Sequence, residues 1–522
     1  MIDPRQPLLQ SRIDVHDRKQ FELKLEYQPS GRDPRSEYRV EMWMFLPASL
    51  NVDPETYPRQ SFYADIHNYV RLKTPVLEMD GILCAETSPL RQLERELEAV
   101  PQQARQAELV YLAKLLSCVF RGALRRFAAS LEQRCAAVGA NPTSPASREL
   151  QQHTRLLMDE TRRVLQRFRA VSESVGSYSH FEEKTRASLR LVDEYLSLTI
   201  EQLVRKAVTE MERLPRAGQW VELRKELLLE VIREEEYRRS RAWKSVLSPT
   251  GDNEEYMHRV GFLKKFCQNI LFLRVRRDQR RQGWEEVLFA IAAGISMAFA
   301  TAIAFWAQLR FTQVSLNFFL ILVVGYMMKD RIKEGMRRIL SSAAAQYLFD
   351  RTITIAEPVT NERIGICKEK VDYVRPAQVP AEILKLRQSD DFATVSQGEM
   401  SEVLFRYQKE IVLDADDLVE MGTGKAGVTD IIRWNVQRLL RDMDDPEFAL
   451  EYVDLDDLTV GRIRGAKSYL VDVAFRFTFD DADDRGNRLE MVRLVLDRNG
   501  IKRMIRMDGR GDPAVSPVRS VA

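Results

Sequence analysis

The stretch that decides the fold is Val287–Ala307, VLFAIAAGISMAFATAIAFWA, which runs for 21 residues without a charge. At about 1.5 Å per residue, a helix of this length covers the roughly 30 Å hydrocarbon core of a bilayer. A long helix in a soluble protein usually carries a polar stripe, and no charged residue interrupts this segment. The sequence therefore predicts a transmembrane helix here.

A second apolar run, Val314–Met328, follows after a short polar stretch that contains Arg310. Its 15 residues reach only about 22 Å, which is less than the usual span of a bilayer. We expect this run to recruit Phe311–Gln313, to thin the bilayer, or to form a re-entrant segment. Together the two runs predict a helical hairpin.

Basic residues flank the hairpin on both sides. Those before the first run are Arg274, Arg276, Arg277, Arg280 and Arg281, and those after the second are Lys329, Arg331, Lys333, Arg337 and Arg338. Because positive residues mark the cytoplasmic side, we predict a multi-pass protein of an inner (cytoplasmic) membrane with both termini in the cytoplasm. The five arginines adjoin the apolar edge, which favours anionic lipid headgroups as their partner. A formal net charge of +2 gives no field that would attract nucleic acid.

Small residues recur every four positions in the first run and form two neighbouring ridges. One ridge consists of Ala290, Gly294, Ala298 and Ala302, and the other of Ala292, Ser296, Ala300 and Ala304. Small side chains let helices approach closely within lipid. We expect the second run to cover one ridge and an identical subunit to cover the other, and we expect further protein partners. Neither run contains an ionisable residue, so a transporter is disfavoured.

The predicted fold class is a multi-domain α+β membrane protein. The predicted parts are a β-rich domain (1–86), a bundle of long helices (87–283), the transmembrane hairpin (284–329), a juxtamembrane helix with a connector (330–391), an α+β domain with an antiparallel meander (392–507) and a disordered tail (508–522). The bundle helices are expected over Pro89–Val138, Ser147–Ser172, Glu182–Arg213 and Val221–Val246, with a fifth running from Glu254 toward the membrane.

Alternation of apolar residues predicts the strands. Phe21–Tyr27 and Tyr38–Met44 alternate with period two and predict a β-hairpin, and Tyr469–Phe479 alternates most regularly. Asn499 and Gly500 separate two further runs, as in a hairpin turn. The stretch from Phe405 to Leu413 is expected to be a strand, and Thr429–Met443 is expected to be a helix.

One motif suggests chemistry. Gly422, Gly424, Lys425 and Gly427 form the sequence GTGKAG directly before the helix expected from Thr429. Glycine amides at a helix N-terminus suit a phosphate or another anion. The motif departs from a Walker A loop because Ala426 follows Lys425, and a plain turn is the alternative. No metal site and no cofactor are predicted, because the five histidines are far apart and no two cysteines are spaced as a ligand pair.

The function predicted from these features is that of an integral inner-membrane protein with large cytoplasmic domains, acting as a scaffold, a sensor or a recruiter of partners. The alternative is a membrane-tethered enzyme or a protein that responds to nucleotide or phosphate through the Gly422–Gly427 loop. No catalytic motif is present, so an enzyme is the less favoured of the two.

Overall fold

A computed structural model gives the fold. It describes the chain apart from residues 1–8, 28–34, 100–104, 138–144, 214–216, 279, 311–314, 348, 357–361, 388–401, 415–426, 455–458, 482–483, 508–513 and 518–522. The fold mixes helices with several sheets, as an α+β protein requires. The chain divides into two compact units. The β unit contains Met1–Val70, Leu273–Leu418 and Gly427–Ala522, and the helical unit consists mainly of Arg71–Phe272.

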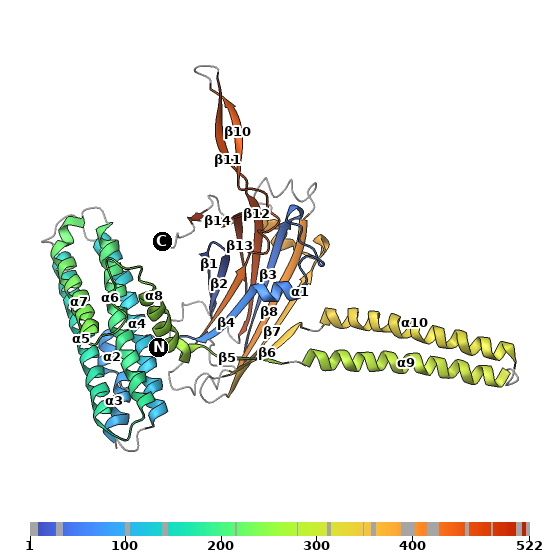
Figure 1. The fold of residues 1–522 in the computed structure, drawn as a ribbon, viewed down its shortest axis with the longest axis horizontal. Coiled ribbons are helices and arrows are strands. Elements are labelled where there is room, and N and C mark those ends of the chain that lie inside the picture. The colour runs from blue at the N-terminus through green and yellow to red at the C-terminus, as the bar shows by residue number, and fades with distance from the viewer. Residues whose placement is uncertain are drawn as a thin grey trace. The chain divides into compact units, whose positions relative to one another are not determined.

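The larger sheet of the β unit has nine strands in the order β15-β14-β13-β12-β3-β8-β7-β6-β5 (Figure 1). Its members are β3 (Arg35–Pro47), β5 (Arg274–Asp278), β6 (Arg351–Ala356), β7 (Arg363–Tyr373), β8 (Glu402–Asp414), β12 (Tyr469–Asp481), β13 (Asp484–Asp497), β14 (Gly500–Arg506) and β15 (Ala514–Pro517). Neighbouring strands pair antiparallel.

A second sheet has four strands in the order β1-β2-β9-β4, and buried side chains of the two sheets contact one another. Its strands are β1 (Leu9–Asp17), β2 (Gln20–Tyr27), β9 (Val428–Asn435) and β4 (Ile66–Leu72). Alternate residues of β2 are buried, and the rings of Phe21 and Phe475 stack across the sheets at 5.8 Å. The core of the unit therefore lies between the sheets, as the period-two patterns require.

The β unit differs from the predicted order of domains. β3 pairs with β8 and β12, and β2 pairs with β9, so the predicted blocks 1–86 and 392–507 belong to one unit. The expected hairpin between Phe21–Tyr27 and Tyr38–Met44 is wrong, because the two strands lie in different sheets. The Asn499–Gly500 turn is found as expected, with Gly500 at a φ of 135° that favours glycine. The expectation of a disordered tail is wrong for Ala514–Pro517, which pairs with β14.

Two segments are inserted into the β unit. The helical unit follows β4 and precedes β5, and a bridge between Arg71 and Phe272 closes its two ends. The helical hairpin lies between β5 and β6, which are neighbours in the same sheet. Both insertions therefore leave the β unit and return to it at adjacent positions.

The helical unit packs long helices side by side (Figure 1). Its helices are α2 (Met79–Cys84), α3 (Pro89–Ala99), α4 (Gln106–Ala137), α5 (Pro145–Ser177), α6 (Glu183–Glu212), α7 (Val221–Ser240) and α8 (Glu254–Gln268). α8 ends before β5 and does not run into the apolar segment. Within the unit, ion pairs join α5 to α7, among them Arg155–Glu226 at 2.7 Å and Arg169–Glu234 at 2.7 Å.

The hairpin consists of α9 (Arg280–Arg310) and α10 (Leu316–Tyr347), which lie antiparallel side by side (Figure 1). Among the described residues, one helix is long and apolar enough to cross a membrane, over Glu286–Arg310 of α9. α10 is not such a helix, because its first charged residue is Lys329 and its uncharged part is only Leu316–Met328.

The remaining elements are short. They are α1 (Arg59–Asp65), α11 (Ala381–Arg387), the 3-10 turns Ala48–Leu50, Ala217–Trp220, Asn269–Leu271 and Pro376–Gln378, and the two-stranded ribbon β10 (Glu447–Val453) with β11 (Val460–Ala466). The ribbon was not expected from the sequence. Every residue of β10 is exposed.

Candidate functional site

A small cavity of about 80 Å³ lies inside the β unit, between β4 and strands β5 to β8. Strand alternation brings its lining together. β4 contributes Ile66, Asn68 and Val70, which are two residues apart and therefore share one face. On the opposite sheet, Glu369 of β7 faces Lys409 of β8 and Arg351 of β6 in register.

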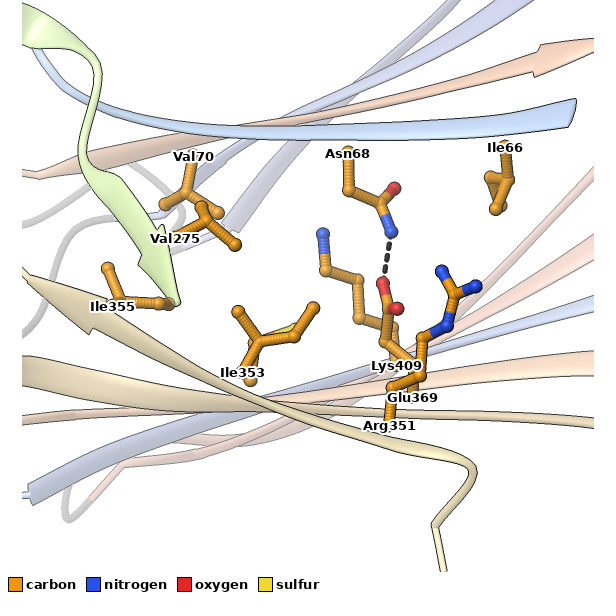
Figure 2. A pocket seen from close by; sticks show the side chains of 10 residues that line it. Ile66, Asn68, Val70, Val275, Arg351, Ile353, Ile355, Glu369 and Lys409 are labelled. Carbon is orange, nitrogen blue, oxygen red and sulfur yellow. Dashed lines mark hydrogen bonds between the residues drawn. The ribbon is translucent and has the colours of Figure 1, made fainter. Parts of the chain in front are cut away.

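The cavity has an apolar end and a polar end (Figure 2). Val70, Val275, Ile353 and Ile355 gather at the apolar end. At the polar end, Asn68 reaches down to Glu369 with Lys409 and Arg351 beside them. The arrangement places ionisable groups inside a sandwich core, where an unpaired charge is costly.

Glu369 is 1% exposed and accepts two hydrogen bonds at the polar end. The Tyr407 hydroxyl donates to its Oε1 at 2.8 Å, and the Asn68 side-chain amide donates to the same oxygen. Burial, and next the charge of Glu369, raise the pKa of Tyr407 well above its usual value. The Oδ1 atom of Asn68 is buried and has no hydrogen-bond partner among the described residues. The cavity can hold a water molecule that would donate to this oxygen.

Lys409 and Asp430 form a buried ion pair beside the cavity. The Lys409 Nζ lies 2.6 Å from Asp430 Oδ1, and both side chains are 1% exposed. The Tyr38 hydroxyl lies 3.4 Å from the other carboxylate oxygen. Burial is the largest single influence and acts to lower the pKa of Lys409, but the charges of Asp430, Cys367 and Glu369 and the hydrogen bond to Asp430 together raise it, so the net shift is upward. Lys409 therefore remains charged at neutral pH.

The chain re-enters the sheet from the hairpin in the same region. Asp350, directly before β6, accepts hydrogen bonds from Arg59 Nη1 at 3.1 Å, from the Tyr63 hydroxyl at 3.0 Å and from the Val371 amide at 2.8 Å. The next residue, Arg351, lies 3.9 Å over the ring of Tyr63. These contacts fix the junction between α10 and the sheet.

The cavity is too small for most substrates. At roughly 30 Å³ per water it holds two or three waters, whereas ligand pockets usually measure about 300–1,000 Å³. Burial raises the pKa of the Cys367 thiol well above its usual value, so this thiol is a poor nucleophile. No cluster of three or more His, Cys, Asp or Glu side chains that could bind a metal is found among the described residues. These properties suit a small, water-filled polar cavity with a structural role, next to the strands that the hairpin connects.

The predicted anion loop receives less support than the sequence suggested. Gly422, Gly424 and Lys425 lie outside the described residues, and Gly427 is buried directly before β9. The helix expected over Thr429–Met443 is wrong, because Val428–Asn435 forms strand β9. Without that helix the loop loses the positive end of a helix dipole, and phosphate binding stays a prediction.

The predicted lipid-binding arginines fall in two elements. Arg274, Arg276 and Arg277 belong to β5, which is the edge strand of the larger sheet, and Arg280 and Arg281 begin α9. The side chains of Arg274 and Arg276 are exposed. Their interaction with headgroups stays a prediction.

The sequence alone did not identify the polar residues in and beside the cavity, which are Lys409, Asp430, Glu369 and Asn68. One signal was available in the strand expected near Phe405–Leu413. Its inward residues Phe405, Tyr407, Lys409, Ile411 and Leu413 include one lysine in an otherwise apolar or aromatic set. A lysine in the apolar phase of a strand indicates a buried charge with a partner. Comparisons with protein-family models, curated proteins and solved structures found no match to this chain.

Proposed function

We propose that this protein is a membrane-anchored scaffold or sensor that holds its β unit and its helical unit on the cytoplasmic side of an inner membrane, with the α9–α10 hairpin as anchor. The observation that carries the proposal is the pairing of β5 with β6. Asp278, near the start of α9, pairs with Thr352, shortly after α10. This pairing supports a topology in which both ends of the hairpin lie on the same side of the membrane.

This constraint applies to α10, whose composition alone does not predict that it crosses a membrane. If α9 crosses the membrane, the chain has to come back for β6 to pair with β5. The 13 residues Leu316–Met328, which are uncharged and include the polar Asn317, extend about 20 Å. Lys329 on one side and Arg310 on the other can extend their charged ends toward the two interfaces, which shortens the distance to be covered. Two crossings in a hairpin satisfy these requirements.

Cysteine labelling tests the anchor and its topology. Because Cys84 is exposed and would itself react, the experiment starts from the Cys84→Ser variant. Leu309→Cys at the tip, which is 87% exposed, should react with a membrane-impermeant maleimide added outside spheroplasts. Glu286→Cys, at the base, should react only after lysis. Release of the protein by alkaline carbonate would refute the anchor, and a tip that is unreactive from both sides would refute the two crossings.

A further inference from the structure

A groove of about 300 Å³ lies between α9 and α10 in the half of the hairpin nearest its tip. Its lining is apolar and includes Ile303 and Trp306 of α9 and Leu320, Val324, Gly325 and Met328 of α10. A Cβ on Gly325 would lie 3.0 Å from Ile303, so the helices are close together at this point. Val324 and Trp306 are 57% and 54% exposed. The groove is therefore narrow between the helices and open along one side.

The length of the groove is close to that of one bilayer leaflet. The step of eight residues from Leu320 to Met328 corresponds to about 12 Å of helix. One leaflet is about half of the roughly 30 Å hydrocarbon core. The volume is at the lower end of the range of small-molecule pockets, which is about 300–1,000 Å³. These dimensions suit one acyl chain that lies along the two helices.

Arg331 lies beyond the groove on the side toward the β unit. It follows Met328 by three residues and Val324 by seven, so it shares their face of α10. Its side chain is exposed. Glu334, one turn further on, pairs with Arg338 at 3.5 Å, and among the described residues Arg331 has no ion-pair partner. Because a guanidinium can bind phosphate through two hydrogen bonds, this end of the groove suits a phosphate group.

We propose that the groove binds one anionic phospholipid of the cytoplasmic leaflet, with an acyl chain along Leu320–Met328 and the phosphate on Arg331. The inference rests on the proposed function, which places the tip half of the hairpin in the hydrocarbon core and Lys329 at the cytoplasmic interface. Arg331, about half a turn further from the tip, is then level with the headgroups. The cytoplasmic leaflet is the one that carries anionic lipids. A zwitterionic headgroup has an ammonium group beside its phosphate, which Arg331 repels, so an anionic headgroup is preferred.

Trp306 lines the groove and serves as a local reporter of the bound chain. The full chain is placed in vesicles of phosphatidylcholine that contain a small fraction of phosphatidylglycerol. Bromine on the acyl chains of one lipid or the other quenches tryptophan fluorescence on contact, and subtraction of the Trp306→Phe signal isolates Trp306. Brominated phosphatidylglycerol should quench Trp306 about fivefold more than the same fraction of brominated phosphatidylcholine, as expected for one arginine at a membrane surface.

Three variants separate the groove from the general charge of the hairpin. Arg331→Gln should abolish the excess quenching by phosphatidylglycerol. Lys333→Gln is the matched control, because it removes one charge from an exposed position two residues away, on the opposite face of α10, and should keep the excess. Val324→Phe should also remove the excess, because the larger side chain fills the groove.

The outcomes distinguish this inference from the proposed function. Equal quenching of the wild type by the two brominated lipids would show that bulk lipid covers the groove, and the inference would be wrong while the anchor stands. An excess that Lys333→Gln loses as fully as Arg331→Gln, or that Val324→Phe keeps, would also overturn the inference. If neither lipid quenches Trp306, the hairpin is not in the bilayer and the proposed function itself fails.

Discussion

At the scale of the residue, the β unit depends on charges buried in a sandwich core. Lys409 and Asp430 approach to 2.6 Å, and each is nearly inaccessible to solvent. A buried pair of this kind contributes little compared with apolar residues, but removal of one partner leaves the other charge without compensation. Stability should therefore respond strongly to single substitutions at this pair and less to paired ones.

Lys409→Met should destabilise the protein by about 3–5 kcal/mol, because Asp430 would remain buried without its cation. Lys385→Met, at an exposed lysine of α11, is the control and should change stability by less than about 0.5 kcal/mol. Adding Asp430→Asn to Lys409→Met should recover part of the loss. Denaturant unfolding followed by tryptophan fluorescence measures all three, and an unchanged midpoint for Lys409→Met would contradict the buried pair.

Alkaline pH should destabilise the β unit. Burial raises the pKa of Cys367 above its usual 9.0, and burial raises those of Tyr38 and Tyr407 above their usual 10.0. As pH rises past these usual values, the unfolded chain loses protons that the folded chain retains, so the free energy of unfolding falls. Lys409, whose pKa is also raised, acts in the same direction.

We therefore expect the contribution of these groups to be constant from pH 7 to about 9 and to decline above that. Denaturant titrations at a series of pH values measure the trend. Tyr407→Phe should reduce the slope because it removes one titrating group. Stability that increases above pH 9 would show that these hydroxyls and this thiol are not buried in their neutral forms.

At the scale of the element, α10 packs unevenly along its length. Gly325 lies against Ile303 of α9, so a larger residue there would have to displace it. Gly335, ten residues later on the same helix, would meet nothing within 4 Å. The two glycines therefore form a matched pair for testing the register of the hairpin.

Gly325→Leu should separate the helices near Ile303, with an overpacking cost of about 1–3 kcal/mol. Gly335→Leu should leave the hairpin closed and favour the helix slightly, because glycine is the poorer helix former. Spin labels on the exposed Phe305 and Phe319 positions would report the separation in detergent solution. Equal distances in the two variants would show that the register is different.

The β10–β11 ribbon is a second informative element. Phe448, Leu450 and Tyr452 share one face and are 44–50% exposed, while Glu447 and Glu451 on the other face pair with Arg464 and Arg462. A two-stranded ribbon without a covering layer adds little to a core. Replacing Glu447–Ala466 with a short turn should leave the thermal midpoint unchanged. A clear loss in a calorimetric scan would show that the ribbon stabilises the β unit.

At the scale of the whole molecule, the β unit is assembled from three distant parts of the chain and carries two insertions. The hairpin is the connection between β5 and β6, which pair directly with each other in the sheet. The Asp350 contacts lie on the β-unit side of this junction. The hairpin should therefore be removable without loss of the sandwich.

Replacing residues 279–348 with an Asn-Gly turn should yield a folded protein in the soluble fraction, because such a turn suits an antiparallel connection. The full chain, prepared in parallel, should stay in the membrane fraction. Circular dichroism and cooperative unfolding check the fold. A truncated protein that still sediments with membranes would show that the anchor lies elsewhere, and an unfolded one would show that the β unit needs the hairpin.

The sequence by itself determined the elements whose signal is local. The uncharged run Val287–Ala307 predicted an apolar helix, period-two alternation predicted Tyr469–Phe479 as a strand, and Asn499–Gly500 predicted a turn. Breaks in helical patterning also placed most of α5, α6 and α7, because periodicity and helix-ending residues act over a few residues.

Only the tertiary structure decided the features that depend on distant pairing. These are the joining of β3 with β8 and β12, the meeting of Lys409 with Asp430, and the level of the α10 charges beside α9. Val428–Asn435 pairs along β2 as a strand, and its β-branched and aromatic residues favour that conformation, so the helix expected here disregarded a local signal. The physical reason is that strand partners and helix register are chosen by packing between separate segments of the chain, whereas a pattern along the chain reports only which face of each segment is apolar.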